Sequence, residues 1–187
     1  MTGSATKPEY PPLLKIGRHD LALEELEALC VAKFPSSSTR RQIMDGLREV
    51  ISKLKSSGIE CELWIDGSFL TEKIDADDCD LVLRCCGDFY DNATGDQQEA
   101  IDWVGSNLKA SHRCDSYVFY EYDEGSPNYW IGEYMYCYWM RQWGFGRPKP
   151  SPNPPDLKGI AVVKLPLPQL VALPDPAAVE TASDPAA

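Results

Sequence analysis

Three aspartates fall where two strand-like segments of the sequence begin. Asp78 and Asp80 flank Cys79 in "DCDLVLR" (78–84), and Asp115 stands second in "CDSYVFYEY" (114–122). Residues two apart on a strand project from the same face, so Asp78 and Asp80 repel each other unless a cation lies between them. Oxygen ligands of this kind suit Mg²⁺ or Mn²⁺, which bind through a few carboxylates plus substrate phosphates.

The third aspartate completes a site only if the two strands are neighbours. Asp115 would then join Asp78 and Asp80, and three acids could hold two metal ions about 3.5–4 Å apart, the spacing used for in-line displacement at phosphorus. The alternative at this point is an acidic turn, with each carboxylate facing solvent at the edge or start of its strand.

A Gly-Ser pair, Gly67 and Ser68, follows the strand-like run "ECELWID" (60–66). A glycine at this place lets the backbone approach a phosphate closely, and the free N–H groups of a helix that starts in "SFLTEK" (68–73) attract anions. The pair is also typical of an ordinary turn, so its chemistry depends on the acids that come after it.

Charge and composition limit the classes of function. The chain has 187 residues and a formal net charge of −11, which disfavours broad nucleic-acid docking but permits a nucleotide substrate, because a divalent cation neutralises carboxylates locally. The sequence shows no apolar signal segment and no run of membrane-spanning length. Seven cysteines without a CxxC pair favour reduced thiols packed as small apolar residues. We therefore expect a cytoplasmic protein that does not enter a membrane.

Apolar periodicity divides the chain into an irregular lead (1–19), one domain (20–165) and a Pro/Ala-rich tail (166–187) that we expect to be disordered. Asp20 is expected to cap a first helix, and Thr39 with Gln42 has the spacing of a capping box for a second that Gly58 ends. The full prediction is an α/β (α+β) domain, a small mixed sheet of about four strands flanked by helices, with helices from 20, 39, 100 and 128 and strands over 60–66, 78–84, 114–122 and 158–166.

Three surface features carry two interpretations each. The basic residues of the second helix are predicted to form a solvated face, with a tRNA or partner-protein contact as the alternative. The aromatic run 128–146 is predicted to pack, with stacking of a base or RNA nucleotide as the alternative. The late basic residues either contact phosphates or balance nearby acids. The members of the first and third groups are Arg40, Arg41, Arg48, Lys53 and Lys55, and Arg141, Arg147, Lys149 and Lys158.

The segment "DGSFLTEKIDADDCDLVL" resembles the signature of the polymerase-β-type nucleotidyltransferase superfamily: a Gly-Ser turn, roughly ten residues, Asp-x-Asp on a strand and a third acid on a later strand. Here nine residues separate Ser68 from Asp78. More narrowly, the chain is similar to small, mostly uncharacterised bacterial nucleotidyltransferase-like proteins. That likeness runs from "PPLL" and "LALEELE" to "GFGRPK" and "LKGIAVV" and covers most of residues 11–165. Cys79 departs from the more usual branched aliphatic residue, and the link before Lys158 is longer than usual.

The resemblance implies a minimal nucleotidyltransferase fold and a set of roles. Gly67 and Ser68 would hold the phosphates of a nucleoside triphosphate, and Thr71 and Lys73, which match a "T-x-K" pattern, would assist them. Asp78 and Asp80 would bind both Mg²⁺ (or Mn²⁺) ions, and Asp115 would complete the site beside the attacking hydroxyl.

The implied reaction moves a nucleoside monophosphate to a hydroxyl of RNA (including tRNA), protein or a small molecule. One alternative is a catalytically silent relative that binds a nucleotide or a partner protein, in a toxin–antitoxin or phage-defence setting by family analogy. Another is a metal-dependent phosphohydrolase that uses the same acids with water as the nucleophile.

Overall fold

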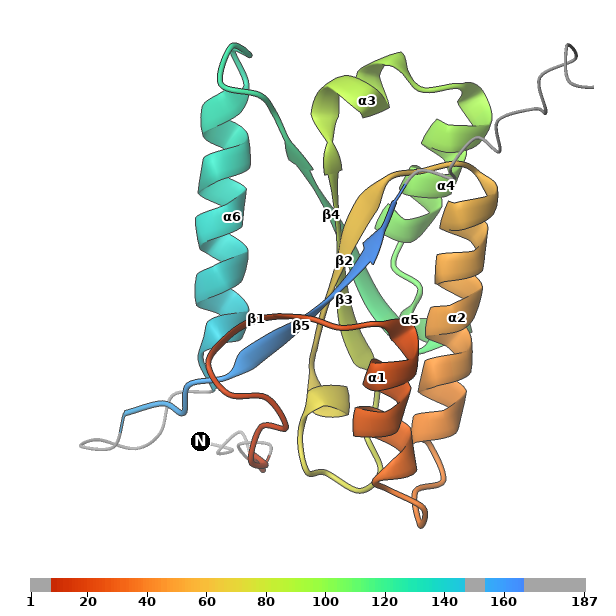
Figure 1. Ribbon diagram of the computed structural model, residues 1–187, viewed down its shortest axis with the longest axis vertical. Helices are drawn as coiled ribbons and strands as arrows, with labels where there is room; N and C mark the ends of the chain where they lie inside the picture. The colour runs from red at the N-terminus through yellow and green to blue at the C-terminus, as the bar shows by residue number, and fades with distance from the viewer. Residues whose placement is uncertain (1–7, 147–153, 167–187) are drawn as a thin grey trace, which may run out of the picture.

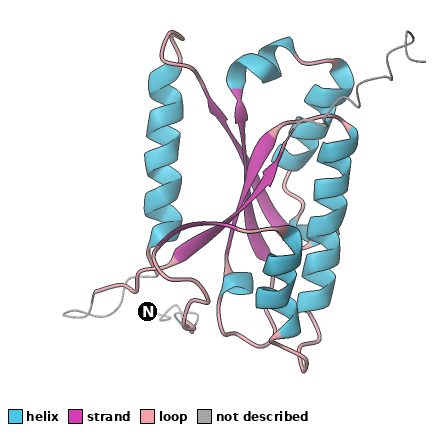
Figure 2. Ribbon diagram, in the orientation of Figure 1, coloured by secondary structure: helices cyan, strands magenta, loops and turns pink. Residues whose placement is uncertain are grey.

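Five apolar segments build one mixed β-sheet. The computed structural model describes residues 8–146 and 154–166. The strands, drawn in magenta in Figure 2, follow across the sheet the order β1 (Gly17–Asp20), β5 (Gly159–Leu165), β2 (Cys61–Asp66), β3 (Cys79–Cys86) and β4 (Cys114–Glu121). β2 runs antiparallel to both of its neighbours, whereas β1 pairs with β5, and β3 with β4, in parallel. The expected α+β class with a mixed sheet is confirmed.

Helices cover both faces of this sheet (Figure 1). One face carries the long helix α2 together with α4, α1 and α5, while α6 lies alone against the other face. The short helix α3 follows β3. Each face therefore has its own apolar core, and the two cores are separated by the strands. The bounds are α1 (Leu23–Glu27), α2 (Arg40–Ser56), α3 (Gly87–Asn92), α4 (Gly95–Gly105), α5 (Lys109–His112) and α6 (Tyr129–Gly144).

Alternation along β2 and β3 decides which core each side chain enters. Leu63 and Leu81 belong to the larger core beneath α2, whereas Trp64 and Val82 belong to the smaller core beneath α6. Full burial of an apolar side chain of this size contributes about 1.5–3 kcal/mol, so a register slip of one residue would be costly. The same alternation continues to the ends of the strands and puts Asp80 on the side of the sheet that α6 covers.

The first strand corrects two expectations. Gly17–Asp20 forms β1 and not the end of an irregular lead, so the sheet has five strands where about four were expected. Asp20 does not cap α1, because the N-cap of that helix is Ala22. The Asp20 carboxylate instead accepts a hydrogen bond from Lys164 at 2.6 Å. A four-residue strand without apolar alternation gives little periodic signal, and its pairing with β5 joins segments far apart in sequence.

The start of α2 is also held differently from the expected capping box. Thr39 is the N-cap, but its hydroxyl donates to the carbonyl of Ala76 at 2.7 Å. The hydroxyl oxygen of Ser37 accepts from the Arg40 N–H at 3.2 Å instead. The helix expected over 68–73 is a single 3₁₀ turn, Ser68–Leu70, too short to supply a substantial helix dipole.

The remaining predicted elements are confirmed as α2, α4, α6, β2, β3, β4 and β5. The tail expected to be disordered lies, beyond Pro166, outside the described residues. All seven cysteines are unpaired thiols. Among the described helices, none has both the length and the apolar character that a bilayer crossing requires.

Candidate metal centre

Strand pairing brings the three predicted aspartates together. Asp80 lies opposite Asp115 in the parallel β3–β4 register, and Asp78 directly precedes β3. One carboxylate oxygen from each of the three lies within 4.8 Å of the others. Opposite oxygens around a single Mg²⁺ are about 4.2 Å apart, because each Mg–O bond is 2.0–2.1 Å. The three carboxylates therefore need only a small movement to share one cation.

A fourth acid, Asp66, stands beside this trio. It ends β2 directly opposite Asp80, and its side chain is only 4% exposed. The ammonium of Lys158 lies 2.7 Å from the Asp66 carboxylate. Burial raises the pKa of Asp66, and the charge and hydrogen bond of Lys158 oppose that rise. Sequence reasoning left Asp66 out of the site, although it directly precedes the Gly-Ser pair and shares a strand face with Trp64.

Asp80 carries the strongest electrostatic signature of the trio. Burial, followed by the neighbouring charges of Asp66, Asp78 and Asp115, raises its pKa to about 7, while Lys109 acts in the opposite direction. Both causes penalise the ionised carboxylate when no cation is present. A bound divalent cation would remove the repulsion and favour the ionised form.

Lys109 is the protein's own counter-ion for the trio. Its ammonium lies 2.5 Å from Oδ2 of Asp78 and 3.2 Å from Oδ2 of Asp115, and the hydrogen bond with Asp78 is the main cause that raises the pKa of Lys109. Asn107 donates a second hydrogen bond to Asp115 at 2.9 Å. The pKa of Asp115 lies below its usual value because hydrogen bonds from Lys109 and Tyr117 outweigh the effect of burial, the largest single contribution. Neither Lys109 nor Asn107 belongs to a recognisable motif, so no sequence pattern indicates a role for them.

Gly67 has a packing role that the sequence interpretation did not include. Its φ is +84°, and a Cβ at this position would lie 2.8 Å from Oδ2 and 2.9 Å from the backbone nitrogen of Asp80. A side chain here would be strained by its backbone conformation and would also displace Asp80. Gly67 therefore allows the end of β2 to approach the trio closely, and its backbone also hydrogen-bonds the Asp66 carboxylate.

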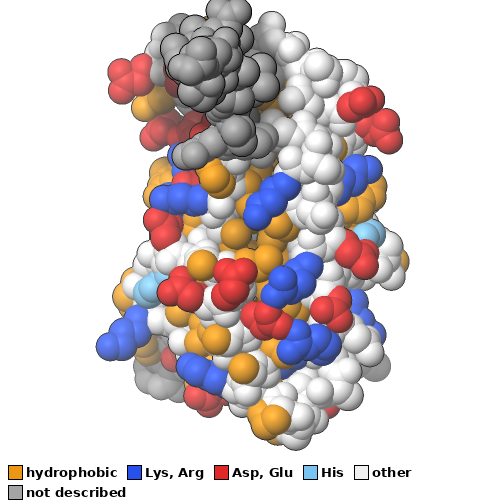
Figure 3. Space-filling view, turned by 45° about the vertical axis from the view of Figure 1, so that its right-hand side comes forward, with side chains coloured by type: hydrophobic (Ala, Val, Ile, Leu, Met, Phe, Trp, Pro, Cys, Tyr) orange, Lys and Arg blue, Asp and Glu red, His pale blue; other side chains and the backbone are white. Residues whose placement is uncertain are grey.

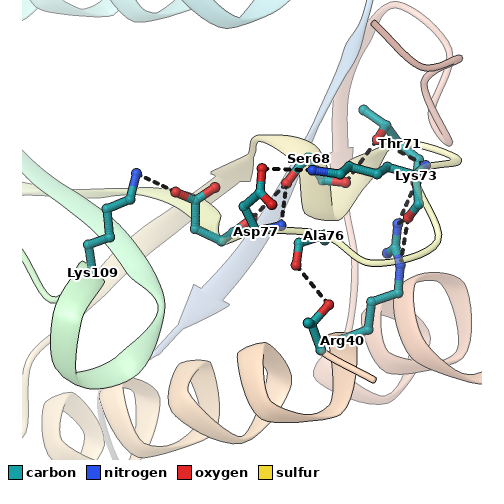
Figure 4. Close-up of polar contacts among 9 residues, drawn as sticks. Arg40, Ser68, Thr71, Lys73, Ala76, Asp77 and Lys109 are labelled. Atoms are coloured by element: carbon teal, nitrogen blue, oxygen red, sulfur yellow. Dashed lines mark hydrogen bonds and ion pairs between the residues drawn. The ribbon is translucent and has the colours of Figure 1, made fainter. Parts of the chain in front are cut away.

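The other residues expected to bind phosphate hold the loop that leads to Asp78 (Figure 4). The Ser68 hydroxyl accepts from the Asp77 N–H at 3.0 Å and donates to the Asp78 carbonyl at 3.3 Å. Thr71 donates to the Ser68 carbonyl at 2.9 Å, and the Lys73 ammonium lies 2.7 Å from Asp77. Ser68 thus adjoins the trio through the backbone of Asp78, whereas Thr71 and Lys73 make their contacts within the loop.

Arg40 corrects the expectation that it belongs to a solvated basic face. The residue is fully buried, and burial lowers its pKa. Its guanidinium donates hydrogen bonds to backbone carbonyls at 2.6–3.2 Å, and Figure 4 shows it beneath the loop that contains Lys73. It fixes the backbone between the Gly-Ser turn and Asp78 through the carbonyls of Phe69, Thr71, Lys73 and Ile74, and ties this loop to the segment after α1 through the carbonyl of Cys30.

Three other residues of the predicted basic face have acidic or aromatic partners. Arg41 and Arg48 both pair with Glu27, and the Lys53 ammonium lies 4.6 Å from the centre of the Trp103 ring. Figure 3, turned toward the α2 side of the molecule, shows basic and acidic side chains interspersed on this face. Such a mixed surface is typical of a solvated face and lacks the single-sign patch that nucleic-acid docking favours.

The aromatic residues of α6 divide into two groups. Trp139 and Trp143 are buried in the smaller core, as the packing interpretation predicts. Trp130, Tyr134 and Tyr138 are 66%, 63% and 45% exposed. Of the late basic residues, Arg147 and Lys149 lie outside the described residues, and Lys158 pairs with Asp66 and does not stand free for a phosphate.

Comparison with known proteins yields one match. The model described as "Family of unknown function (DUF6932)" matches residues 8–164. No curated protein and no solved structure matches the chain. The matched range contains all four acids and both lysines of the site.

Proposed function

The chain belongs to DUF6932, a family of unknown function, and for this member we propose metal-dependent nucleotidyl transfer from a nucleoside triphosphate to a hydroxyl. The proposed cofactor is Mg²⁺ or Mn²⁺, and the proposed acceptors are RNA, protein or a small molecule. The observation that carries the proposal is the convergence of Asp78, Asp80 and Asp115 within 4.8 Å beside the Gly67–Ser68 turn.

The charge balance of the site supports a divalent cation. When ionised, the four carboxylates of Asp66, Asp78, Asp80 and Asp115 carry four negative charges, and Lys158 offsets one of them. Once Lys109 has left its carboxylates, a net charge of −3 remains to attract divalent cations. An all-oxygen donor set of carboxylates selects Mg²⁺ or Mn²⁺ over softer metals.

Each residue of the site has a role in the proposed reaction. When bound, the metal ions would polarise the α-phosphate and lower the pKa of the attacking hydroxyl, whose oxygen bonds to the α-phosphorus as the α–β phosphate bond breaks and pyrophosphate and the hydroxyl proton are released. Asp78, Asp80 and Asp115 would hold the metal ions, and Asp115, on the outer strand β4, would lie beside the attacking hydroxyl. The backbone at Gly67 and Ser68 would receive the triphosphate from the β2 side. Lys109 would leave its two carboxylates and then be free to contact a phosphate.

A silent relative is the second candidate, and one observation favours it. Lys109 already bridges Asp78 and Asp115, so part of the trio is neutralised without metal. Such a protein would bind nucleotide, or a partner protein, without turnover. The metal-dependent phosphohydrolase shares every residue of the site and differs only in using water as the nucleophile.

The test is incubation with each α-labelled nucleoside triphosphate, Mg²⁺ or Mn²⁺, and total cellular RNA and protein. The proposal predicts transfer of label to an acceptor, lost in Asp80→Asn and kept in Asp45→Asn, which removes an exposed carboxylate from α2. Labelled monophosphate without labelled acceptor would identify the hydrolase. Nucleotide binding without either product would identify the silent relative, and no nucleotide binding would reject the transferase, the hydrolase and the nucleotide-binding form of the silent relative.

A further inference from the structure

A pocket lies between the edge strand β4 and helix α6. Its volume is about 520 Å³, and its lining is largely aromatic. Ligand pockets in proteins typically have volumes of about 300–1,000 Å³ and apolar walls with a few polar groups. It is lined by Tyr117 and Val118 from β4, by Tyr134, Met135, Tyr138 and Trp139 from α6, and by Gly105 at the end of α4.

Two segments connect this pocket to the acidic trio. Tyr117 lines the pocket with its ring and hydrogen-bonds the Asp115 carboxylate. Gly105, on the other wall, lies two residues before Asn107, which also hydrogen-bonds Asp115. Asp115 and Tyr117 are two residues apart on one strand, a distance of about 6.6 Å. A ligand in the pocket would therefore lie beside the proposed reaction centre.

The rings are arranged to accept a flat group. Trp139 is buried and packs against Tyr117 and Tyr138 at centroid distances of 5.2 Å in each case, which limits the movement of both tyrosines. Tyr134 and Tyr138, one helical turn apart, remain 63% and 45% exposed. Exposed rings of this kind stack on bases because every base has a flat π-face.

The edge position of β4 distinguishes this pocket from a purely apolar one. Within residues 8–146 and 154–166, β4 pairs with β3 alone, so alternate backbone N–H and C=O groups of β4 point away from the sheet. These groups can form hydrogen bonds with the polar edge of a ring that lies among the tyrosines. Stacking faces combined with in-plane donors and acceptors suit a nucleobase better than an aliphatic chain.

We propose that this pocket receives a nucleobase of the nucleotide that reacts at the acidic trio. The inference rests on the proposed function. It adds a binding site for the nucleobase, a group that the carboxylates of the trio do not recognise. The base has two sources, the nucleoside triphosphate or the terminal residue of an acceptor strand, and the same rings serve either. Because the Gly67–Ser68 turn adjoins β2 and the pocket adjoins β4, the ligand extends across the end of the sheet.

The experiment compares binding to the full-length protein and to Tyr134→Ala/Tyr138→Ala. The ligands are an α,β-methylene nucleoside triphosphate, which cannot undergo transfer, an oligoribonucleotide with a free 3′-hydroxyl, and inorganic tripolyphosphate, all with Mg²⁺. The matched control is Trp130→Ala, because Trp130 is exposed on α6 and does not line the pocket. Thermal melting checks that all variants are folded.

The proposal predicts a loss of about 5- to 150-fold in affinity for a base-containing ligand, as for other base-stacking aromatic residues, with tripolyphosphate binding and the control unchanged. A loss confined to the triphosphate analogue or to the oligonucleotide identifies the source of the base. Equal affinity of variant and wild type for both nucleotides would overturn this inference alone. Absence of binding for every phosphate ligand would overturn the proposed function as well.

Sedimentation equilibrium tests whether a second copy of the chain binds at the pocket. A dimer that the double substitution dissociates, with nucleotide affinity unchanged, would show that a second copy of the chain occupies the pocket, and would also overturn the inference.

Discussion

The Lys109 ammonium lies 2.5 Å from Oδ2 of Asp78, so a positive charge of the protein already pairs with a carboxylate that is proposed to bind metal. Lys109 comes from the short helix α5, whereas Asp78 precedes β3. The free protein therefore holds its acids together with a positive charge of its own. A metal ion must displace that charge, so the lysine sets the affinity for metal.

Lys109→Met is expected to strengthen metal binding. The substitution removes a competing cation and leaves the carboxylates in place, so we expect Mn²⁺ affinity to rise by about 3- to 30-fold, consistent with loss of a partly screened charge pair. Isothermal titration calorimetry measures the change. Lys164→Met is the control because it breaks the exposed pair with Asp20, far along the sheet. Weaker binding in Lys109→Met would show that the ammonium supports the metal site.

Asp80→Asn is expected to stabilise the metal-free protein at neutral and higher pH. The folded pKa of Asp80 is raised from 3.8 to about 7, so the folded state binds this proton more tightly than the unfolded state does. The wild type consequently loses stability as pH rises from about 4 to 7, and the loss is complete above 7. Asparagine does not titrate, so the free energy of unfolding of Asp80→Asn rises relative to that of the wild type over the same pH range, by about 2–4 kcal/mol.

Urea denaturation in EDTA at pH 5 and pH 8 tests this prediction. The difference in free energy of unfolding between Asp80→Asn and wild type should be larger at pH 8. The control Asp45→Asn should stay within about 0.5 kcal/mol of wild type at both values. A gain confined to pH 5 would contradict the electrostatic account of Asp80.

Arg40→Ala is expected to destabilise the fold and release the loop before Asp78. The substitution leaves buried carbonyls without their donor, and we expect a loss of about 3 kcal/mol or more in the free energy of unfolding. Lysine has one ammonium and cannot replace a guanidinium that donates to five carbonyls, so Arg40→Lys should recover little of the lost free energy of unfolding. Arg41→Ala, an exposed neighbour paired with Glu27, should lose about 1 kcal/mol or less. Similar losses at both positions would refute the special role of Arg40.

Gly67→Ala is expected to weaken metal binding as well as stability. The new Cβ would stand 2.8 Å from the Asp80 carboxylate, at a φ of +84°, so Asp80 must move away from the trio. We expect a loss of about 1–3 kcal/mol in the free energy of unfolding and at least a tenfold fall in Mn²⁺ affinity. Gly95→Ala, which meets no atom within 4 Å, should change neither. Unchanged metal affinity in Gly67→Ala would show that Gly67 is not needed to position Asp80 for metal binding.

Local patterns were sufficient to predict the strands that carry the acids. Two-residue alternation in 60–66, 78–84 and 114–122 located β2, β3 and β4 and showed that Asp78 and Asp80 share a face. Whether Asp115 joined them depended on parallel pairing of β3 with β4, which links residues 35 positions apart. That pairing is a tertiary property, so the sequence alone left the solvent-exposed alternative open.

The residues that sequence reasoning missed act through tertiary contacts. Arg40 belongs by periodicity to the polar face of α2, but the loop that follows the Gly-Ser turn folds over it and supplies carbonyls instead of water. Asp66, Lys109 and Lys158 come from three separate elements and form pairs only when the sheet is assembled. The spacing of residues in the sequence does not predict such contacts.

The central claim is that the trio binds divalent metal and presents it to a nucleoside triphosphate. The most direct measurement is anomalous diffraction from crystals grown with Mn²⁺ and an α,β-methylene nucleoside triphosphate. The account predicts Mn²⁺ coordinated by Asp78, Asp80 and Asp115, Lys109 displaced, and the phosphates extending toward Gly67 and Ser68. Crystals that bind the nucleotide elsewhere, with Lys109 still bridging Asp78 and Asp115 and no Mn²⁺ between the carboxylates, would contradict it.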